Sequence, residues 1–166
     1  MSSLKEIQAL QLQSEKVFDY FEEICAIPHG SRNTKAISDY LVAFAKKHDL
    51  TWYQDESNNV VIVQEATAGY EQADTIILQG HMDMVCEKEN DCAIDFEKDG
   101  LDLYVDGDFL KARGTTLGGD DGIAVAYALA IMDSPEIAHP RLEVVITVDE
   151  EIGMLGAEAI DLSMLK

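Results

Sequence analysis

Apolar side chains recur at helical spacing through the first part of the chain. The first predicted helix covers about residues 4–26, because Ser3 and Glu6 form a capping box at its start and Pro28 stops the pattern. Its apolar face consists of Ile7, Leu10, Val17, Phe18, Phe21 and Ile24. A second amphipathic helix is predicted over about residues 33–48.

Further along the chain the pattern changes from helical to strand-like. Residues 51–54 and 59–64 are β-rich and flank a turn-prone stretch, which predicts a hairpin. Residues 75–78 and 142–148 are almost continuously apolar, as expected of central strands that are covered on both faces. Another hairpin is predicted around Asp106-Gly107.

Residues 121–132 are apolar almost all round, which predicts a buried helix, and a last helix is expected after Gly153. Helices that alternate with apolar strands indicate one layered α/β domain with some antiparallel pairing. The sequence shows no internal repeat, low-complexity segment or convincing linker between domains. Its 166 residues, 47% of them hydrophobic, suffice for one domain with a substantial core.

The chain is strongly acidic. It carries 12 Lys and Arg against 32 Asp and Glu, a formal net charge of -20, which repels phosphate backbones and anionic membrane surfaces. We therefore expect neither nucleic acid nor a membrane as a partner. Carboxylates are densest in residues 87–108, where a solvated face is the simpler interpretation, since cation binding requires converging oxygens. No apolar stretch approaches the roughly 20 residues that span a bilayer.

Cysteine usage indicates a reducing compartment. Cys25, Cys86 and Cys92 are odd in number, lack a CxxC spacing and follow no secretory signal, since residues 1–6 are polar. A cytoplasmic location is therefore expected. A thiol hydrolase that uses Cys86 or Cys92 is disfavoured, because neighbouring acids raise a thiol pKa and neither cysteine has a base partner in a motif.

Three short clusters of ionisable side chains lie where a predicted strand or helix begins or ends. In the first, a buried strand leads into His81 and Asp83, which point the same way on extended backbone. This geometry lets Asp83 hold one imidazole nitrogen of His81 while the other nitrogen faces a metal. The simpler alternative is an ordinary pair on the surface.

The other two clusters supply carboxylates. Asp149, Glu150 and Glu151 follow the second buried strand, at the carboxyl end where α/β sheets bind ligands, although a charged helix start is the simpler alternative. Asp120 and Asp121 begin the buried helix behind two glycines, and an N-cap accounts for only one of them. Imidazole with carboxylates suits zinc, manganese or cobalt, and one carboxylate shared by two ions is an economical two-metal site.

These clusters belong to three longer segments, residues 79–85 (QGHMDMV), 112–123 (ARGTTLGGDDGI) and 148–154 (VDEEIGM). In this order and with this spacing they closely resemble the M20 metallopeptidases, and within them the aminoacyl-histidine dipeptidases of the peptidase D type. The likeness runs through nearly the whole chain, including residues 27–31 and 36–41. It implies the zinc-peptidase fold, a layered α/β/α domain with a mixed, largely parallel sheet.

The resemblance implies a di-metal dipeptidase that hydrolyses Xaa-His-type dipeptides. It assigns His81 as a ligand of one zinc and Asp83 as the residue that orients it. It assigns Asp120 as the ligand that bridges the two ions, and it implies a cis peptide bond between Asp120 and Asp121. Two divalent ions are the implied cofactors, zinc first, with manganese and cobalt as alternatives.

The same resemblance gives the two adjacent glutamates different roles. Glu151 matches a ligand of the second zinc, and Glu150 matches the general base that takes a proton from the metal-bridging water. The remaining histidines, His29, His48 and His139, lie outside the ligand motifs and are expected in surface or loop positions.

Known members of the family are longer than this chain. They supply one more carboxylate ligand and a final histidine from later positions, and they carry a lid domain. Residues 1–166 are therefore expected to be the amino-terminal part of the catalytic domain, without the lid and the carboxy-terminal part. Each metal would keep two protein ligands, where catalytic zinc ordinarily has three. We expect the chain alone to bind metal weakly and to hydrolyse nothing.

Two interpretations remain open at this point. The first is part of a cytosolic dipeptidase, and the second is a non-catalytic acidic binding or scaffold module that retains the fold. A reading frame that continues past Lys166 with a later histidine ligand would distinguish them. Uncovered apolar surface also favours self-association into a homo-oligomer.

Overall fold

The computed structural model describes residues 15–166. In chain order its elements are α2 (Glu15–Cys25), α3 (Lys35–Lys47), β1 (Thr51–Gln54), β2 (Val60–Gln64), β3 (Ile76–His81), β4 (Leu103–Asp106), β5 (Phe109–Ala112), α4 (Gly119–Met132), β6 (Leu142–Thr147) and α5 (Leu155–Ala159). The first predicted helix is confirmed from residue 15 onward, while Ser3, Glu6 and the rest of its start lie outside the described residues.

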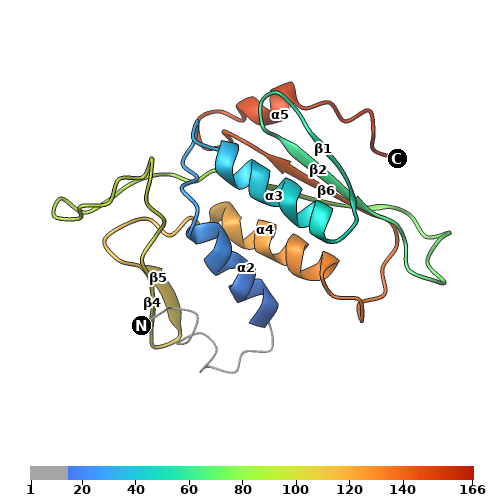
Figure 1. The fold of residues 1–166 in the computed structure, drawn as a ribbon, viewed down its shortest axis with the longest axis horizontal. Helices are drawn as coiled ribbons and strands as arrows, with labels where there is room; N and C mark the ends of the chain where they lie inside the picture. The colour runs from blue at the N-terminus through green and yellow to red at the C-terminus, as the bar shows by residue number, and fades with distance from the viewer. Residues whose placement is uncertain (1–14) are drawn as a thin grey trace.

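Four strands form the main sheet in the order β1-β2-β6-β3. Figure 1 shows β1, β2 and β6 side by side. The β1–β2 and β2–β6 pairings are antiparallel, and the β3–β6 pairing is parallel. Strands β4 and β5 make a separate antiparallel pair around Asp106-Gly107. Both predicted hairpins and the mixed sheet are therefore confirmed, with one of the three pairings of the main sheet parallel.

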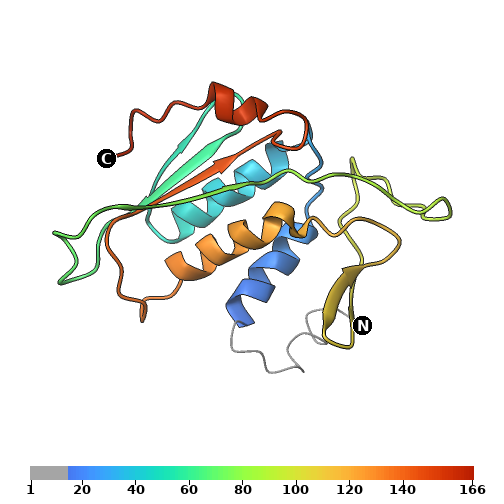
Figure 2. The same ribbon diagram turned by 180° about the vertical axis from the view of Figure 1, so that it is seen from behind.

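Helices cover one face of this sheet and the end of the chain covers the other. The main core joins α2, α3 and α4 to the inward residues of β2 and β6, such as Ile62 and Val144. Val61, Val63 and Val145 point to the opposite face, where Ile160, Met164 and Leu165 pack on them. Figure 2 shows this carboxy-terminal segment on the side away from α3 and α4. The predicted α/β/α layering is confirmed.

Strand β3 differs from the expectation of a strand covered on both faces. Every residue of β6 is buried, but Ile76 and Ile77 of β3 are 45% and 52% exposed. The reason is position: β3 is the last strand of the sheet and pairs only with β6 among the described residues. Half of the residues of helix α4 are buried, and its Tyr127 is exposed. Within residues 15–166, every helix is too short or too polar to cross a bilayer.

Candidate metal centre

The parallel pairing of β3 with β6 creates the meeting point of the predicted site residues. His81, the last residue of β3, lies in register with Thr147, the last residue of β6. The segments that follow both strands therefore leave the sheet side by side. Helix α4 packs against β3, and its start brings Asp120 Oδ1 to 3.2 Å from His81 Nε2.

Three of the predicted residues gather as a potential ligand set. Donor atoms of His81, Asp120 and Glu151 all lie within 4.8 Å of one another. They come from the end of β3, the start of α4 and the segment after β6. The imidazole is buried, whereas the Asp120 side chain is 87% exposed, so the set opens to solvent on the Asp120 side.

Asp83 contacts both the His81 imidazole and the segment after β6. Its carboxylate is fully buried and lies 3.4 Å from His81 Nδ1, while the Asp83 carbonyl oxygen lies 3.0 Å from the same nitrogen. Its Oδ1 accepts the main-chain N–H of Glu150 at 3.0 Å, and its Oδ2 accepts the Ser31 hydroxyl at 2.7 Å and the N–H of Glu151 at 3.4 Å. One carboxylate thus fixes the imidazole and the segment that carries both glutamates.

These contacts set the ionisation of the buried pair. Burial raises the pKa of Asp83, but hydrogen bonds with His81, Ser31 and the Glu150 N–H outweigh it and leave the pKa below its ordinary value. Burial lowers the pKa of His81, but hydrogen bonds with Asp83 and Asp120 outweigh it and raise the pKa to about 9. Without a metal, His81 is therefore an imidazolium at neutral pH.

The start of α4 is not regular helix. The peptide bond between Asp120 and Asp121 is cis, as the resemblance implied, and Asp120 has extended rather than helical dihedral angles. Asp121 Oδ2 accepts the main-chain N–H of His81 at 3.4 Å. A Cβ added at Gly80 would lie 2.7 Å from that oxygen, so glycine allows this close approach. Burial raises the pKa of Asp121.

The carboxylates of both glutamates lie near His81. Glu150 Oε2 lies 3.8 Å from His81 Nε2, and its side chain is partly exposed. Glu151 contributes to the ligand set. Burial raises the pKa of Glu151, His81 opposes this, and the nearby carboxylates Asp120 and Glu150 add to the rise. Both glutamates therefore reach the same site.

The sequence did not assign a role to the loop before α3. Met84 forms a bridge with Gly30, which places Ser31 over Asp83, and the N–H of Arg32 donates to Asp149 Oδ1 at 2.6 Å. Residues 27–31 belonged to the resemblance, so the family likeness was the available signal for Ser31.

The other histidines stay outside the ligand set. His29 and His139 lie in loops as expected, but both are buried rather than on the surface. His29 Nδ1 lies 2.6 Å from the Ile27 carbonyl oxygen, and His139 Nδ1 lies 2.7 Å from the Pro140 carbonyl oxygen. These carbonyl oxygens satisfy the Nδ1 of each ring, whereas His29 Nε2 is buried without a hydrogen-bond partner. His48 follows α3 and stacks on Phe44.

The cysteines form no disulfide in the structure. All three are free, and Cys25 is buried in the core. Burial raises the pKa of Cys86, and Glu97, Asp83 and Glu87 raise it further. A raised pKa keeps the Cys86 sulfur protonated, which agrees with the expectation that Cys86 is a poor nucleophile.

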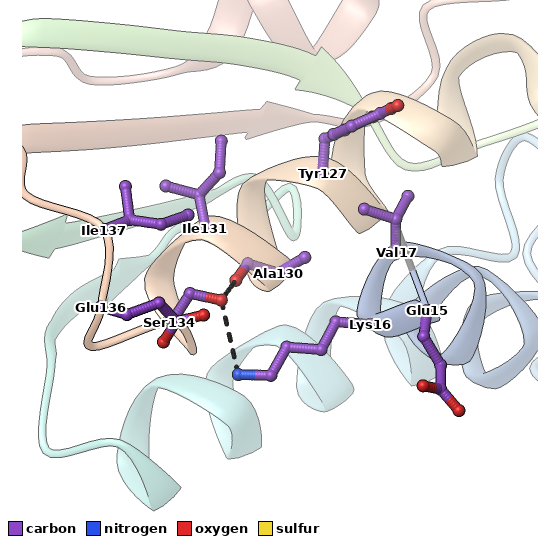
Figure 3. A pocket seen from close by; sticks show the side chains of 9 residues that line it. All are labelled: Glu15, Lys16, Val17, Tyr127, Ala130, Ile131, Ser134, Glu136 and Ile137. Carbon is purple, nitrogen blue, oxygen red and sulfur yellow. Dashed lines mark hydrogen bonds between the residues drawn. The ribbon is translucent and has the colours of Figure 1, made fainter. Parts of the chain in front are cut away.

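A hollow at the far end of α4 contains none of the predicted site residues. It has a volume of about 360 Å³ and lies between the start of α2 and the end of α4. Figure 3 shows Lys16 reaching the Ser134 hydroxyl there, at 3.4 Å, with Tyr127 and Ile137 at its rim. Since Asp120 begins α4 and Ser134 follows its end, this hollow is remote from the candidate centre.

The ligand set fits a divalent cation by its chemistry. One imidazole and two carboxylates are the donors that zinc, manganese and cobalt take in proteins. The imidazole is held from behind by a buried carboxylate, the usual support for a metal-bound histidine. No other group of three such residues within residues 15–166 brings its donor atoms this close together.

Comparison with known families settles the relationship. Peptidase family M20/M25/M40 matches residues 77–162, which include most of β3, all of α4 and β6, and all five predicted site residues. The chain belongs to this family. The cytosol non-specific dipeptidase of Escherichia coli (strain K12) is 44% identical to this M20 chain over 147 residues, which are 89% of the chain and 30% of that protein.

Solved structures support the same fold. The M20 chain superimposes on aminoacylhistidine dipeptidase from Vibrio alginolyticus with a TM-score of 0.90 and 40% identity, over 93% of this chain and 32% of that one. A tripeptidase from Staphylococcus aureus matches with a TM-score of 0.75 over 92% of this chain and 41% of that one, and at 24% identity it supports the fold alone. The M20 chain thus spans about a third of the length of the two dipeptidases.

Proposed function

We propose that this chain carries part of the active site of a di-metal dipeptidase that hydrolyses Xaa-His-type dipeptides in the cytoplasm. The observation that carries the proposal is the convergence of His81, Asp120 and Glu151 within 4.8 Å, above the buried Asp83. Membership of an M20 peptidase family makes hydrolysis of a peptide bond the matching reaction. The cytoplasmic location rests on the three free thiols and on the E. coli relative's description as cytosolic.

In this proposal His81 and Glu151 would each hold one divalent ion, and Asp120 would serve as a ligand of both. Zinc suits these donors best, with manganese and cobalt as alternatives. When bound, such ions polarise the scissile carbonyl and lower the pKa of a water molecule. Asp83 keeps Nδ1 of His81 engaged, so that Nε2 is the nitrogen presented to the ion.

Glu150 is the proposed general base. Its carboxylate oxygen lies 3.8 Å from His81 Nε2 and therefore at the rim of the ligand set without belonging to it. There it takes a proton from the attacking water and returns it to the leaving amine, which a base in hydrogen-bond reach does with a gain of roughly 10²- to 10⁴-fold. The N–H bond from Glu150 to Asp83 fixes the main chain from which this carboxylate projects.

The preference for a carboxy-terminal histidine residue rests on the sequence resemblance and on the Vibrio alginolyticus enzyme, which is described as an aminoacylhistidine dipeptidase. The three described ligands leave each ion with two protein donors, one fewer than is usual at a catalytic zinc. We therefore propose that the 166-residue chain alone binds metal weakly and hydrolyses nothing.

A chimaera tests these assignments. Residues 1–166 replace the matching third of the Vibrio alginolyticus enzyme, and release of histidine from Ala-His is measured with zinc or manganese. We expect hydrolysis by the chimaera, none by the 166-residue chain, and a loss of about 10³-fold in the chimaera carrying Glu150→Gln, with its metal content unchanged.

Three outcomes would overturn parts of this proposal. Hydrolysis by the isolated chain would show that its own ligands suffice. Undiminished turnover by the Glu150→Gln chimaera would remove Glu150 as the base. A folded chimaera that retains its metals but hydrolyses no dipeptide would favour a binding or scaffold module.

A further inference from the structure

A second hollow adjoins the candidate centre. It has a volume of about 330 Å³ and lies between the loop before α3, the segment after β3 and the segment after β6. Glu151 lines this hollow and also belongs to the ligand set, so the hollow adjoins the ligand set at this side chain. The hollow is large enough for one amino-acid side chain and too small for a folded partner.

Its walls are mainly apolar. Met84, Val85, Phe96 and Ile152 line it, and Val85 and Ile152 are still about two-fifths exposed at the mouth. The inner end is closed by the Gly30 loop, where an added Cβ would lie 2.5 Å from Cys86 Sγ. Apolar surface that solvent still reaches gains free energy when a ligand covers it.

The polar part of the lining has one sign of charge. Glu97 and Glu151 supply two carboxylates, and the lining includes no Lys or Arg. The Ser31 hydroxyl is engaged with Asp83 and the Asn33 amide with the Glu97 carbonyl oxygen, so both are occupied within the protein. With Glu151 assigned to an ion, Glu97 is the carboxylate left to attract an ammonium group and repel a carboxylate.

We propose that this hollow is the subsite for the amino-terminal residue of the dipeptide, with an uncharged aliphatic side chain inside and the free ammonium group near Glu97. This inference rests on the proposed function, because the ligand set marks where the peptide bond lies. A dipeptide has one ammonium and one carboxylate at opposite ends, so Glu97 also sets its direction. The carboxy-terminal residue, with its carboxylate, then lies on the far side of the ligand set.

Binding to the metal-free 166-residue chain tests the subsite without any turnover. Methyl resonances of Met84, Val85 and Ile152 are followed by NMR while L-leucinamide is added in the presence of EDTA. We expect saturable shifts at these methyls. Glycinamide, which lacks the side chain, and N-acetyl-leucinamide, which lacks the ammonium group, should each bind about tenfold more weakly.

Matched variants locate the binding. Ile152→Trp fills the mouth of the hollow and should abolish the shifts at Met84 and Val85, whereas Leu155→Trp, at a similarly exposed position outside the lining, should leave them unchanged. Glu97→Gln should weaken leucinamide about threefold and leave N-acetyl-leucinamide unaffected. Leu-Gly should also bind more tightly than Gly-Leu.

Equal binding of glycinamide and leucinamide, or full binding by Ile152→Trp, would overturn the subsite. Tighter binding of Gly-Leu than of Leu-Gly would overturn the direction. If the chimaera is inactive but leucinamide binds normally, the proposed reaction is wrong and the hollow remains a binding site. If the chimaera is active but leucinamide does not bind, the subsite is wrong and the proposed reaction stands.

Discussion

The main-chain N–H of Glu150 donates to Asp83 Oδ1 at 3.0 Å, which ties the end of β6 to the end of β3. Asp83 thereby controls two things at once: the orientation of the His81 imidazole and the course of the segment that carries Glu150 and Glu151. A change at Asp83 should therefore affect both the folded state and metal affinity.

Asp83→Asn should lower stability by roughly 1–3 kcal/mol, because the amide cannot accept from all the buried donors that the carboxylate serves. Zinc affinity should fall about 10- to 100-fold as His81 loses its anionic support. Urea unfolding and calorimetric titration with zinc measure the two effects. Asp106→Asn, at an exposed pair with Lys111, is the control and should change neither by much. Normal zinc affinity in Asp83→Asn would contradict the orienting role.

The two adjacent glutamates should separate in a metal titration of the 166-residue chain. Glu151→Gln replaces one of three converging donors, a charged carboxylate, by a neutral amide and should reduce zinc affinity at least about tenfold. Glu150→Gln leaves the ligand set intact and should change affinity less than about threefold, since it alters only a nearby charge. The same loss in both variants would show that Glu150 is a ligand and not a base.

Zinc affinity should rise with pH. The pKa of His81 in the metal-free chain is about 9, so below that pH a metal must displace a proton from the imidazole. Between pH 7 and 8 the apparent affinity should therefore increase about tenfold, with about one proton released per ion at pH 7. Calorimetry in buffers of different ionisation enthalpy measures this release. His81→Gln, which has no such proton, should bind more weakly and lose this dependence.

Gly156→Ala should be strongly destabilising. An added Cβ would lie 2.3 Å from the Val148 carbonyl oxygen and 2.5 Å from Asn59 Oδ1, in a buried contact that joins α5 to the end of β6. We expect a loss of at least about 2 kcal/mol in urea unfolding. Gly107→Ala, where φ is +61° but the space is open, should cost about 1 kcal/mol. If Gly156→Ala and Gly107→Ala lost the same stability, the structure around Gly156 would have to relax readily.

The free edge of β3 should promote self-association. Its exposed Ile76 and Ile77 lie on a strand that pairs on one side only among the described residues. The net charge of -20 opposes contact between copies, so association should increase with salt. Light scattering at 50 and 500 mM NaCl should show this for the wild type and much less for Ile77→Lys. Tyr70→Lys, an exposed site off the edge, is the control. A monomer under both conditions would exclude this edge as a self-contact.

Sequence periodicity predicted most elements because local pattern reflects local backbone preference. The buried strand β6, both hairpins and the buried face of α4 follow directly from it. It could not show that β3 lies at a sheet edge, since an apolar run indicates a strand without naming its neighbours. Strand position depends on contacts between residues far apart in the chain.

The sequence predicted the candidate ligands but not the contacts that hold them in place. His81, Asp120 and Glu151 were assigned from motif likeness, and the structure brings them together. The Asp83 contacts with Ser31 and with the main-chain N–H groups of Glu150 and Glu151 were not readable, because backbone donors carry no sequence signal. The burial of His29 was missed for a similar reason, since its partner is a local carbonyl oxygen.

The parallel pairing of β3 with β6 also makes the site a reporter of folding. His81 and Glu151 are 70 positions apart in the sequence, and their donor atoms meet only when these strands align in register. Contacts over such a distance close a long loop and form late. Ions held by His81, Glu151 and the shared Asp120 would bind the aligned chain and not the unfolded one, so zinc at saturating concentration should raise the melting temperature and slow unfolding. The bound ions would then cross-link the ends of β3 and β6, which lie far apart in the sequence.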